Sequence, residues 1–281
     1  MYPRRIAHGL AAPGRVIGQR VKELLSGPRL PYVEVHLTDH CNLNCRGCSH
    51  FSPLADVWYA DIGSHERDMR RLSQLFGNVD KIRLMGGEPL LHPQVCSFLA
   101  VTRRHLPDAV ICLVTNGLLL SAMQPDFWRC CKAQRIVIDV TLYPIHLDTD
   151  SIRRLADAHG VNLHIHALAE FHAGLNLRGD SEPRQAMRHC RSHNYCPFLK
   201  QGSIYPCAAP AFVGYFNRAF GSSVAAAGGL DIHERGVTGA RILQFLEQPC
   251  ETCRYCAHEY RHFQWATSTR QMEEWCFAYD E

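Results

Sequence analysis

The sequence predicts an α/β fold in which a parallel sheet or barrel is followed by a small cysteine-rich domain. Three observations support this prediction. Short strand-like runs alternate with longer helical runs from residue 32 to about residue 168. The strand-like runs alternate polar with apolar residues, as strands with two different faces do. After about residue 185 this order stops, and six cysteines lie between residues 190 and 256.

The expected elements follow one another in a regular order. A first helix is expected at residues 14–26, where Gly27-Pro28 ends it. Five strands are expected at 32–38, 80–86, 109–116, 135–143 and 162–168. Four helices separate them or lie between them, at 64–76, 92–105, 121–132 and 149–159. Strands and helices that alternate in this way form parallel sheets or barrels with right-handed crossovers.

Three of the expected strands carry polar residues at every second position, which places those residues on one face. A strand covered on both faces would be apolar throughout. The polar face therefore predicts an open barrel around a polar cavity, and antiparallel strands with one wet face are the alternative. The polar set comprises Glu34, His36, Thr38, Asp139, Thr141, Tyr143, His164, His166, Glu170 and His172.

Composition and charge narrow the class of protein. The formal net charge of +3 gives no indication of a nucleic-acid partner. The first residues include arginines but no long apolar stretch, so neither a signal peptide nor a membrane span is expected. We therefore expect a cytoplasmic protein with no membrane partner. In a reducing compartment, fourteen cysteines favour metal ligands, catalytic thiols or core residues over disulfides.

The first cysteine group directly follows the first expected strand. Cys41, Cys45 and Cys48 lie at the carboxyl end of that strand, where α/β folds place their active sites. Thiolates bind iron–sulfur clusters or zinc. A structural zinc ion would need a fourth ligand, which His40 or His50 could supply. The spacing of the cysteines alone leaves both kinds of site open.

Three motifs together resemble the radical SAM superfamily: HCNLNCRGC (40–48), MGGEP (85–89) and TNG (115–117). The resemblance implies a partial (β/α)6 barrel over residues 32–185, after a helical N-terminal extension (1–31). It implies that Cys41, Cys45 and Cys48 hold three irons of a [4Fe–4S] cluster, and that S-adenosylmethionine (SAM) binds the fourth. Gly47 departs from the family, which has an aromatic residue there that packs on adenine. The SAM contacts that we expect on this basis are Gly86, Gly87, Glu88, Pro89, Asn116, Asp139 and His166.

The second cysteine group is similar to the opening of the SPASM extension found in radical SAM enzymes. Cys190, Gly202 and Cys207 give the spacing C-x11-G-x4-C, and C-x-x-C-x-x-C follows at 250–256. His262 stands where the full pattern has its next cysteine, which implies the truncated, twitch-like form over residues 186–281. The implied ligands of one auxiliary [4Fe–4S] cluster are Cys190, Cys207, Cys253 and Cys256. Cys196 and Cys250 are then surplus, and a structural zinc ion is the alternative.

The resemblance also implies a reaction in which a 5′-deoxyadenosyl radical removes hydrogen from a C–H bond. A truncated auxiliary domain on a short chain is similar to aminocyclitol dehydrogenases and aminoglycoside epimerases of antibiotic pathways. HFSPLAD (50–56) is also similar to radical SAM proteins of carbohydrate pathways. A surplus thiol favours epimerisation, because an S–H bond can return a hydrogen atom to a carbon radical. We expect Cys250 to be this donor, with Cys196 second.

We therefore expect an epimerase of a sugar or aminoglycoside that uses two [4Fe–4S] clusters and SAM. The alternatives are a dehydrogenase that makes a ketone, a peptide-modifying enzyme, and a non-catalytic iron–sulfur or zinc module. Residues 1–31 are too few for a domain that binds a leader peptide, which speaks against peptide modification. The expected partners are the substrate and a reductase that supplies electrons. Expected substrate contacts are Glu34, Tyr143 and Glu170.

Overall fold

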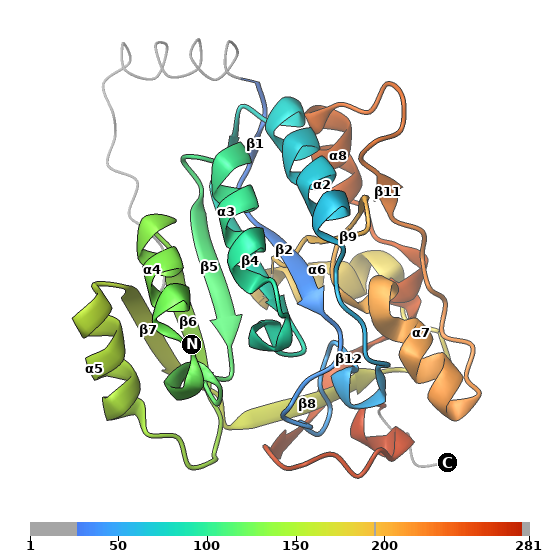
Figure 1. Ribbon diagram of the computed structural model, residues 1–281. Coiled ribbons are helices and arrows are strands. Elements are labelled where there is room, and N and C mark those ends of the chain that lie inside the picture. The colour runs from blue at the N-terminus through green and yellow to red at the C-terminus, as the bar shows by residue number, and fades with distance from the viewer. Residues whose placement is uncertain (1–26, 194, 277–281) are drawn as a thin grey trace, which may run out of the picture.

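The computed structural model describes residues 27–193 and 195–276, so the helix expected at residues 14–26 lies outside the described residues. Five neighbouring parallel strands form the main sheet in the order β2-β4-β5-β6-β7 (Figure 1). They are β2 (Val33–Thr38), β4 (Lys81–Gly86), β5 (Val110–Thr115), β6 (Val137–Leu142) and β7 (Asn162–Ala167). The mixed α/β fold expected from the sequence is confirmed.

Four helices cover one face of this sheet (Figure 1). They are α2 (Ile62–Leu75), α3 (Val95–His105), α4 (Pro125–Ala133) and α5 (Thr149–His159). Asp61 and Asp148 cap the first turns of α2 and α5, where their side chains accept hydrogen bonds from backbone N–H groups three residues on. Gly160 ends α5 in the left-handed conformation, with a φ of 61°. Local sequence signals therefore set these helix boundaries.

The core lies between the sheet and the four helices. Val33, Val35 and Leu37 of β2 are buried in it, together with Ile138 and Val140 of β6. Burial of one such side chain contributes about 1.5 to 3 kcal/mol to stability. Because neighbouring residues of a strand point to opposite faces, this burial turns the polar residues of β2 and β6 away from the helices. The expected alternation is confirmed for these two strands.

The fifth expected strand, 162–168, agrees with β7 within one residue, but the alternation of polar and apolar residues continues beyond the end of this strand. The polar and apolar alternation of the sequence runs from residue 163 to residue 172, but β7 ends at Ala167. Strand β6 ends before Pro144, so few of its backbone groups remain to pair with the chain beyond Ala167. The chain then forms β8 (Glu170–Leu175), which pairs with the antiparallel strand β12 (Cys256–Gln264). Glu170 and His172 therefore do not belong to the main sheet.

The C-terminal part extends the main sheet on the side of β2. Strand β9 (Phe198–Lys200) pairs parallel to β2, and the antiparallel strands β10 (Ser203–Tyr205) and β11 (Leu230–Asp231) follow. Short parallel strands β1 (Arg29–Leu30) and β3 (Asn78–Val79) form a separate pair. The remaining helices of the described residues are α6 (Pro183–His193), α7 (Ala209–Phe220) and α8 (Gly239–Leu246). The 3₁₀ turns are η1 (Ser52–Leu54), η2 (Pro89–Leu91), η3 (Leu120–Ala122), η4 (Glu251–Tyr255) and η5 (Met272–Glu274).

A second, aromatic core joins the C-terminal part to the first cysteine loop. Phe51, just after Cys48, packs with Phe198, Phe212, Phe216 and Trp275 in this cluster. Aromatic side chains of this size dominate the energetics of a core.

No helix among the described residues combines the length and the apolar character needed to cross a membrane.

Candidate active site at the carboxyl ends of the strands

A cavity of about 260 Å³ opens where the strands of the main sheet end. The three cysteines of the first group line it, as the sequence predicts for one shared site. Backbone and side chains from the ends of β4 to β7 complete its wall. The lining residues include Cys41, Cys45, Cys48, Arg83, Gly86, Gly87, Thr115, Asn116, Thr141, Tyr143 and His166.

The sulfur atoms of this group receive N–H donors. The Leu43 N–H donates to Cys41 Sγ at 3.3 Å, and the Trp265 indole N–H donates to Cys45 Sγ at 3.1 Å. The Asn116 side-chain amide lies 3.8 Å from Cys41 Sγ. Burial raises the pKa of the Cys45 thiol to about 12, so the free thiol keeps its proton at neutral pH. A metal ion that binds this sulfur displaces the proton. Buried thiols with directed N–H donors fit the cluster implied by the motif.

Gly86 and Gly87 lie directly against the loop that carries the cysteines. A Cβ atom at Gly86 would lie closer than 3.0 Å to the Thr38 carbonyl oxygen, and one at Gly87 equally close to the His40 carbonyl oxygen. The Gly87 N–H donates to the Thr38 oxygen at 2.9 Å, and the Glu88 N–H to the His40 oxygen at 3.1 Å. Only glycine allows this approach, because any side chain would meet backbone atoms.

Glu88 is fully buried, and it does not line the cavity. One of its oxygens accepts hydrogen bonds from the Leu90 N–H at 3.0 Å and the Thr115 hydroxyl at 2.7 Å. The other accepts the Asn116 N–H at 2.9 Å. Burial raises the pKa of Glu88 to about 7 in spite of these hydrogen bonds, which act in the opposite direction. The carboxylate therefore holds the turn after β5, and a direct contact of Glu88 or Pro89 with SAM stays a prediction.

Gly47 meets an aromatic side chain from the far end of the chain. Its φ is +65°, and a Cβ atom here would lie 2.6 Å from Cζ of Phe263. Phe263 belongs to β12, and the Arg46 guanidinium lies 4.7 Å from the centre of its ring. An aromatic ring from another segment thus fills the space beside the position where the sequence departs from the family motif.

The segment of residues 263–275, called here the C-terminal segment, contacts the first cysteine loop at further points. The Ser268 N–H donates to the Asn44 carbonyl oxygen at 2.8 Å. The Trp275 indole N–H donates to the Cys48 carbonyl oxygen at 2.9 Å. Together with Trp265, these contacts make the C-terminal segment part of the first cysteine site. The sequence does not predict this contact, because single tryptophans and main-chain contacts leave no motif.

A chain of charged and polar side chains crosses the polar face of the sheet. The Arg83 guanidinium lies 3.0 Å from Asp139 Oδ2 and 3.7 Å from Glu34 Oε1. Asp139 Oδ1 lies 3.1 Å from His164 Nδ1 and 3.2 Å from His166 Nδ1. Burial raises the pKa of Asp139, but the hydrogen bond with His164 and the charge of Arg83 outweigh it and lower the pKa overall. Arg83 is not among the expected site residues, although period-two alternation along residues 80–86 places it on the polar face.

The expected substrate and SAM contacts fall into two sets. Tyr143, Asn116 and His166 line the cavity, and Asp139 and Glu34 lie in the chain of polar side chains behind it. Glu170 was expected beside them, and this expectation is wrong. Its side chain is 58% exposed on β8 and forms an ion pair at 3.5 Å with His262. The reason is the departure of β8 from the main sheet.

The six cysteines of the second group come from four separate segments. Cys190 lies on α6, Cys196 precedes β9, Cys207 follows β10, and the others lie at η4. The Cys250 and Cys253 sulfurs are 3.8 Å apart. Burial raises the pKa of Cys196 and of Cys256 to about 12, and the charges of neighbouring thiols add to both shifts. The fold therefore gathers thiols that lie far apart in the sequence, while the auxiliary cluster itself stays a prediction.

The spread of the cysteines bears on the choice between zinc and an iron–sulfur cluster. In a tetrahedral zinc site with Zn–S bonds of about 2.3 Å, the sulfurs lie about 3.8 Å apart. Within residues 27–193 and 195–276, the one set of three potential ligands within 4.8 Å of one another is Asp139, His164 and His166. Neither cysteine group meets this criterion. The Cys250 and Cys253 sulfurs, 3.8 Å apart, lie at the distance of two zinc ligands, so an auxiliary iron–sulfur cluster and a structural zinc ion both stay predictions.

Three comparisons place the chain among known proteins. Residues 35–198 match the model of the Radical SAM superfamily. GTP 3′,8-cyclase of Geobacter sulfurreducens is 34% identical over a match that covers 44% of this chain and 37% of the relative. Molybdenum cofactor biosynthesis protein 1 of Bos taurus is 35% identical, with coverages of 40% and 18%. The chain therefore spans well under half the length of these curated relatives.

One solved structure supports the fold across most of the chain. It is the crystal structure of BtrN in complex with AdoMet and 2-DOIA, with a TM-score of 0.52. The match covers 81% of this chain and 92% of that chain at 17% sequence identity. At this identity the likeness concerns the fold alone.

Proposed function

The chain belongs to the radical SAM superfamily, and on this basis we propose that it removes a hydrogen atom from one carbon of a sugar or aminoglycoside and epimerises that carbon. SAM and the four-iron cluster, when bound at Cys41, Cys45 and Cys48, supply the 5′-deoxyadenosyl radical for this reaction. The observation that carries the proposal is the second cysteine group, because its six thiols exceed by two the four ligands that an auxiliary cluster takes.

The two surplus thiols differ in their surroundings. The sequence favours Cys250 as the hydrogen donor, but its sulfur contacts that of Cys253 at 3.8 Å. Cys196 directly precedes Pro197, whose carbonyl oxygen accepts the Glu34 N–H at 2.9 Å. Cys196 is thus the neighbour in sequence of a residue whose backbone is hydrogen-bonded to β2, one of the strands that carry the polar face of the sheet. This position supports Cys196 over Cys250 as the donor.

The proposed reaction balances in atoms and electrons. The substrate C–H bond breaks and its hydrogen atom leaves with 5′-deoxyadenosine. The donor S–H bond then breaks, and a new C–H bond forms on the opposite face of the same carbon. The resulting thiyl radical takes up one electron and one proton, and a one-electron reductase supplies the electron. An auxiliary cluster, which Cys190, Cys207, Cys253 and Cys256 would hold, would supply a route for this electron.

The lining of the cavity suits a polar substrate without much negative charge. Thr141 and Tyr143 offer hydroxyl groups to sugar hydroxyls. Among the described residues that line the cavity, Arg83 is the one arginine or lysine, and two carboxylates already neutralise it. This charge balance supports a sugar or an aminosugar.

A second candidate function follows from the curated relatives, which are named GTP 3′,8-cyclase. A nucleoside triphosphate carries several negative charges, which proteins commonly bind with several arginines and lysines. The single, neutralised Arg83 of the cavity speaks against this candidate. Cyclisation of a guanine nucleotide is therefore the second proposal and not the first.

The test is a reaction in deuterated water with reconstituted enzyme, SAM, a reductant and a panel of aminoglycosides. We expect an epimer that carries one deuterium from the solvent-exchanged thiol. The Cys196→Ala variant should still cleave SAM but form no epimer, while the Cys250→Ala variant should form it. A ketone product would replace the epimerase proposal with the dehydrogenase alternative. GTP-dependent formation of 5′-deoxyadenosine, with no product from any sugar, would overturn both in favour of the second candidate.

A further inference from the structure

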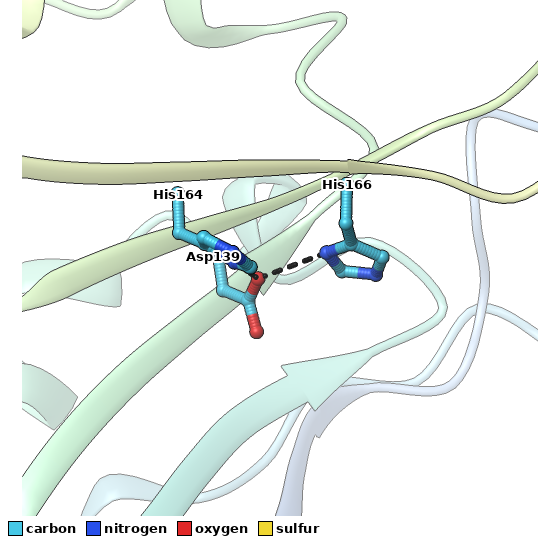
Figure 2. A group of neighbouring side chains, drawn as sticks. All are labelled: Asp139, His164 and His166. Atoms are coloured by element: carbon cyan, nitrogen blue, oxygen red, sulfur yellow. Dashed lines mark hydrogen bonds and ion pairs between the residues drawn. The ribbon is translucent and has the colours of Figure 1, made fainter. Parts of the chain in front are cut away.

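Asp139, His164 and His166 converge on the polar face of the sheet (Figure 2). Their ligand atoms all lie within 4.8 Å of one another, and Asp139 Oδ1 is 3.1 and 3.2 Å from the two Nδ1 atoms. We propose that these three side chains form a site for a single divalent transition-metal ion, distinct from both cysteine groups.

The register of two strands brings the three side chains together. In the pairing of β6 with β7, Asp139 lies opposite His164 and Thr141 lies opposite His166. Residues at every second position share a face, so all four side chains point to the same side. Asp139 is therefore the direct neighbour of His164 and the diagonal neighbour of His166. The arrangement follows from backbone pairing and does not depend on a flexible loop.

The two distances from Asp139 to the histidines fit ligands of one ion. Two ligand atoms that each lie about 2.1 Å from a metal are about 3.0 to 3.4 Å apart at angles of about 90° to 109°. The two oxygen–nitrogen distances at Asp139 are 3.1 and 3.2 Å. Two imidazoles and one carboxylate are a ligand set of catalytic zinc and non-haem iron sites, which leave further positions open.

His166 provides an independent observation. Its Nδ1 atom is buried and has no hydrogen-bond partner among the described residues, although Asp139 Oδ1 lies nearby. A buried polar atom without a partner costs about 1 to 3 kcal/mol. The Thr141 hydroxyl lies 3.3 Å from Nε2 of the same ring. When Thr141 accepts the Nε2 proton, Nδ1 keeps its lone pair, as a metal ligand requires.

The positive charge of Arg83 repels a cation at this site, but the ion pairs of Arg83 reduce this repulsion. It binds Asp139 through the other carboxylate oxygen, at 3.0 Å, and leaves Oδ1 to the histidines. The Glu34 carboxylate lies on another side of the Arg83 guanidinium and offsets part of its positive charge. Second contacts of this kind orient ligating carboxylates in metal sites. An ion can enter from solvent, because the His164 side chain is 66% exposed.

The site also adjoins the cavity, which His166 lines. Open positions on the ion would take a hydroxyl or amino group of a molecule in the cavity. This use of the ion rests on the proposed function, whereas the metal site does not. Its test therefore measures metal binding without SAM and without substrate.

The experiment uses the full chain with its iron reconstituted and adds Zn²⁺ alone. We expect one zinc ion per chain, with X-ray absorption that shows nitrogen and oxygen ligands at about 2.0 to 2.1 Å and no sulfur at about 2.3 Å. His164→Ala and His166→Ala should each weaken binding at least about 100-fold. His172→Ala is the matched control, since this histidine lies on β8 and stacks on Tyr260, and it should bind zinc as the original protein does.

Folding is checked separately, by circular dichroism and thermal unfolding of each variant. Asp139→Asn keeps the shape of the side chain and should also lose the zinc. Sulfur ligation of the bound zinc, or unchanged affinity in folded His164→Ala and His166→Ala, would overturn the proposal. Failure of the original protein to bind zinc would overturn it as well. None of these results depends on whether the enzyme acts on sugars.

Discussion

The two cysteine groups are built in different ways. The first lies in nine consecutive residues of one loop, between strand β2 and the 3₁₀ turn η1. The second is assembled from α6, the approach to β9, the end of β10 and η4. Main-chain hydrogen bonds from Gly87 and Glu88 hold the first loop in place. A site built from one loop can be identified from its spacing, whereas a site assembled from four segments depends on the packing of the whole C-terminal part.

Substitution of one cysteine should have different consequences in the two groups, and we expect this difference to be the largest effect. Cys41→Ala should abolish SAM cleavage, because the first group holds the iron to which SAM binds. Cys207→Ala should leave SAM cleavage measurable, lower the iron content by about four atoms per chain and abolish the epimer. Iron analysis and chromatography of 5′-deoxyadenosine measure both effects. Equal loss of SAM cleavage in the two variants would contradict the division of roles.

Glu88 makes the stability of the first site depend on pH. The pKa of this carboxyl rises from 4.5 to about 7 in the folded protein, so the fold holds the proton more tightly than the unfolded chain does. Its contribution to the free energy of unfolding is therefore greatest below pH 4.5 and falls until about pH 7. The loss amounts to at most about 3 kcal/mol.

Urea unfolding across this pH range measures the effect, with Glu88→Gln as the comparison. The variant cannot ionise here, so its stability should lack this decline. A parallel pH dependence of both proteins would show that Glu88 is already ionised at pH 5.

The close approach of Gly87 to the cysteine loop gives the next effect. Gly87→Ala would force a Cβ atom against the His40 carbonyl, so the loop must move. We expect a loss of about 1 to 3 kcal/mol in the free energy of unfolding and a lower iron content of the first group. Gly214→Ala on α7 is the matched control, because nothing lies within 4 Å of its added Cβ. This control should gain up to about 1 kcal/mol, since alanine favours a helix. Equal stability of the two variants would rule out the steric argument.

The smallest expected effect concerns the indole of Trp265. Trp265→Phe removes the N–H that donates to Cys45 Sγ at 3.1 Å. Hydrogen bonds to sulfur raise the reduction potential of a cluster, so the variant's potential should fall by on the order of 50 mV. Trp128→Phe is the control, because the buried Trp128 Nε1 has no hydrogen-bond partner in the part of the chain that the structure describes. Redox titration followed by electron paramagnetic resonance measures both, and an equal shift in the two variants would exclude a specific role for Trp265.

The sequence predicts much of the barrel and part of the site. The strand from Val33 to Thr38 and the helix from Thr149 to His159 agree with the expected ranges within a residue, because periodicity and capping residues are local signals. The break after Ala167 is not local. It depends on β12, whose Gln264 pairs with Glu170 across a long stretch of sequence. Contacts of this kind become visible only when the chain is folded.

The same limit applies to the candidate site. The cysteine spacing and the Gly86-Gly87 pair predict one shared cavity, because both are written into short motifs. Trp265 and Phe263 leave no such motif, since a single aromatic residue in a sequence is compatible with many positions. Arg83 lies between these cases. Its strand alternates like its neighbours, and that pattern places it on the polar face.

The contacts of Trp265 and Trp275 also bear on the order of events during protein synthesis. The Trp265 indole reaches a sulfur that lies 220 residues earlier in the chain. A ribosome releases the cysteine loop long before it has made the residues that close over it. For most of translation the loop therefore lacks its contacts with Trp265 and Trp275. Delivery of iron to this loop is then best timed after the chain leaves the ribosome, and late truncation would spoil a site whose cysteines are all intact.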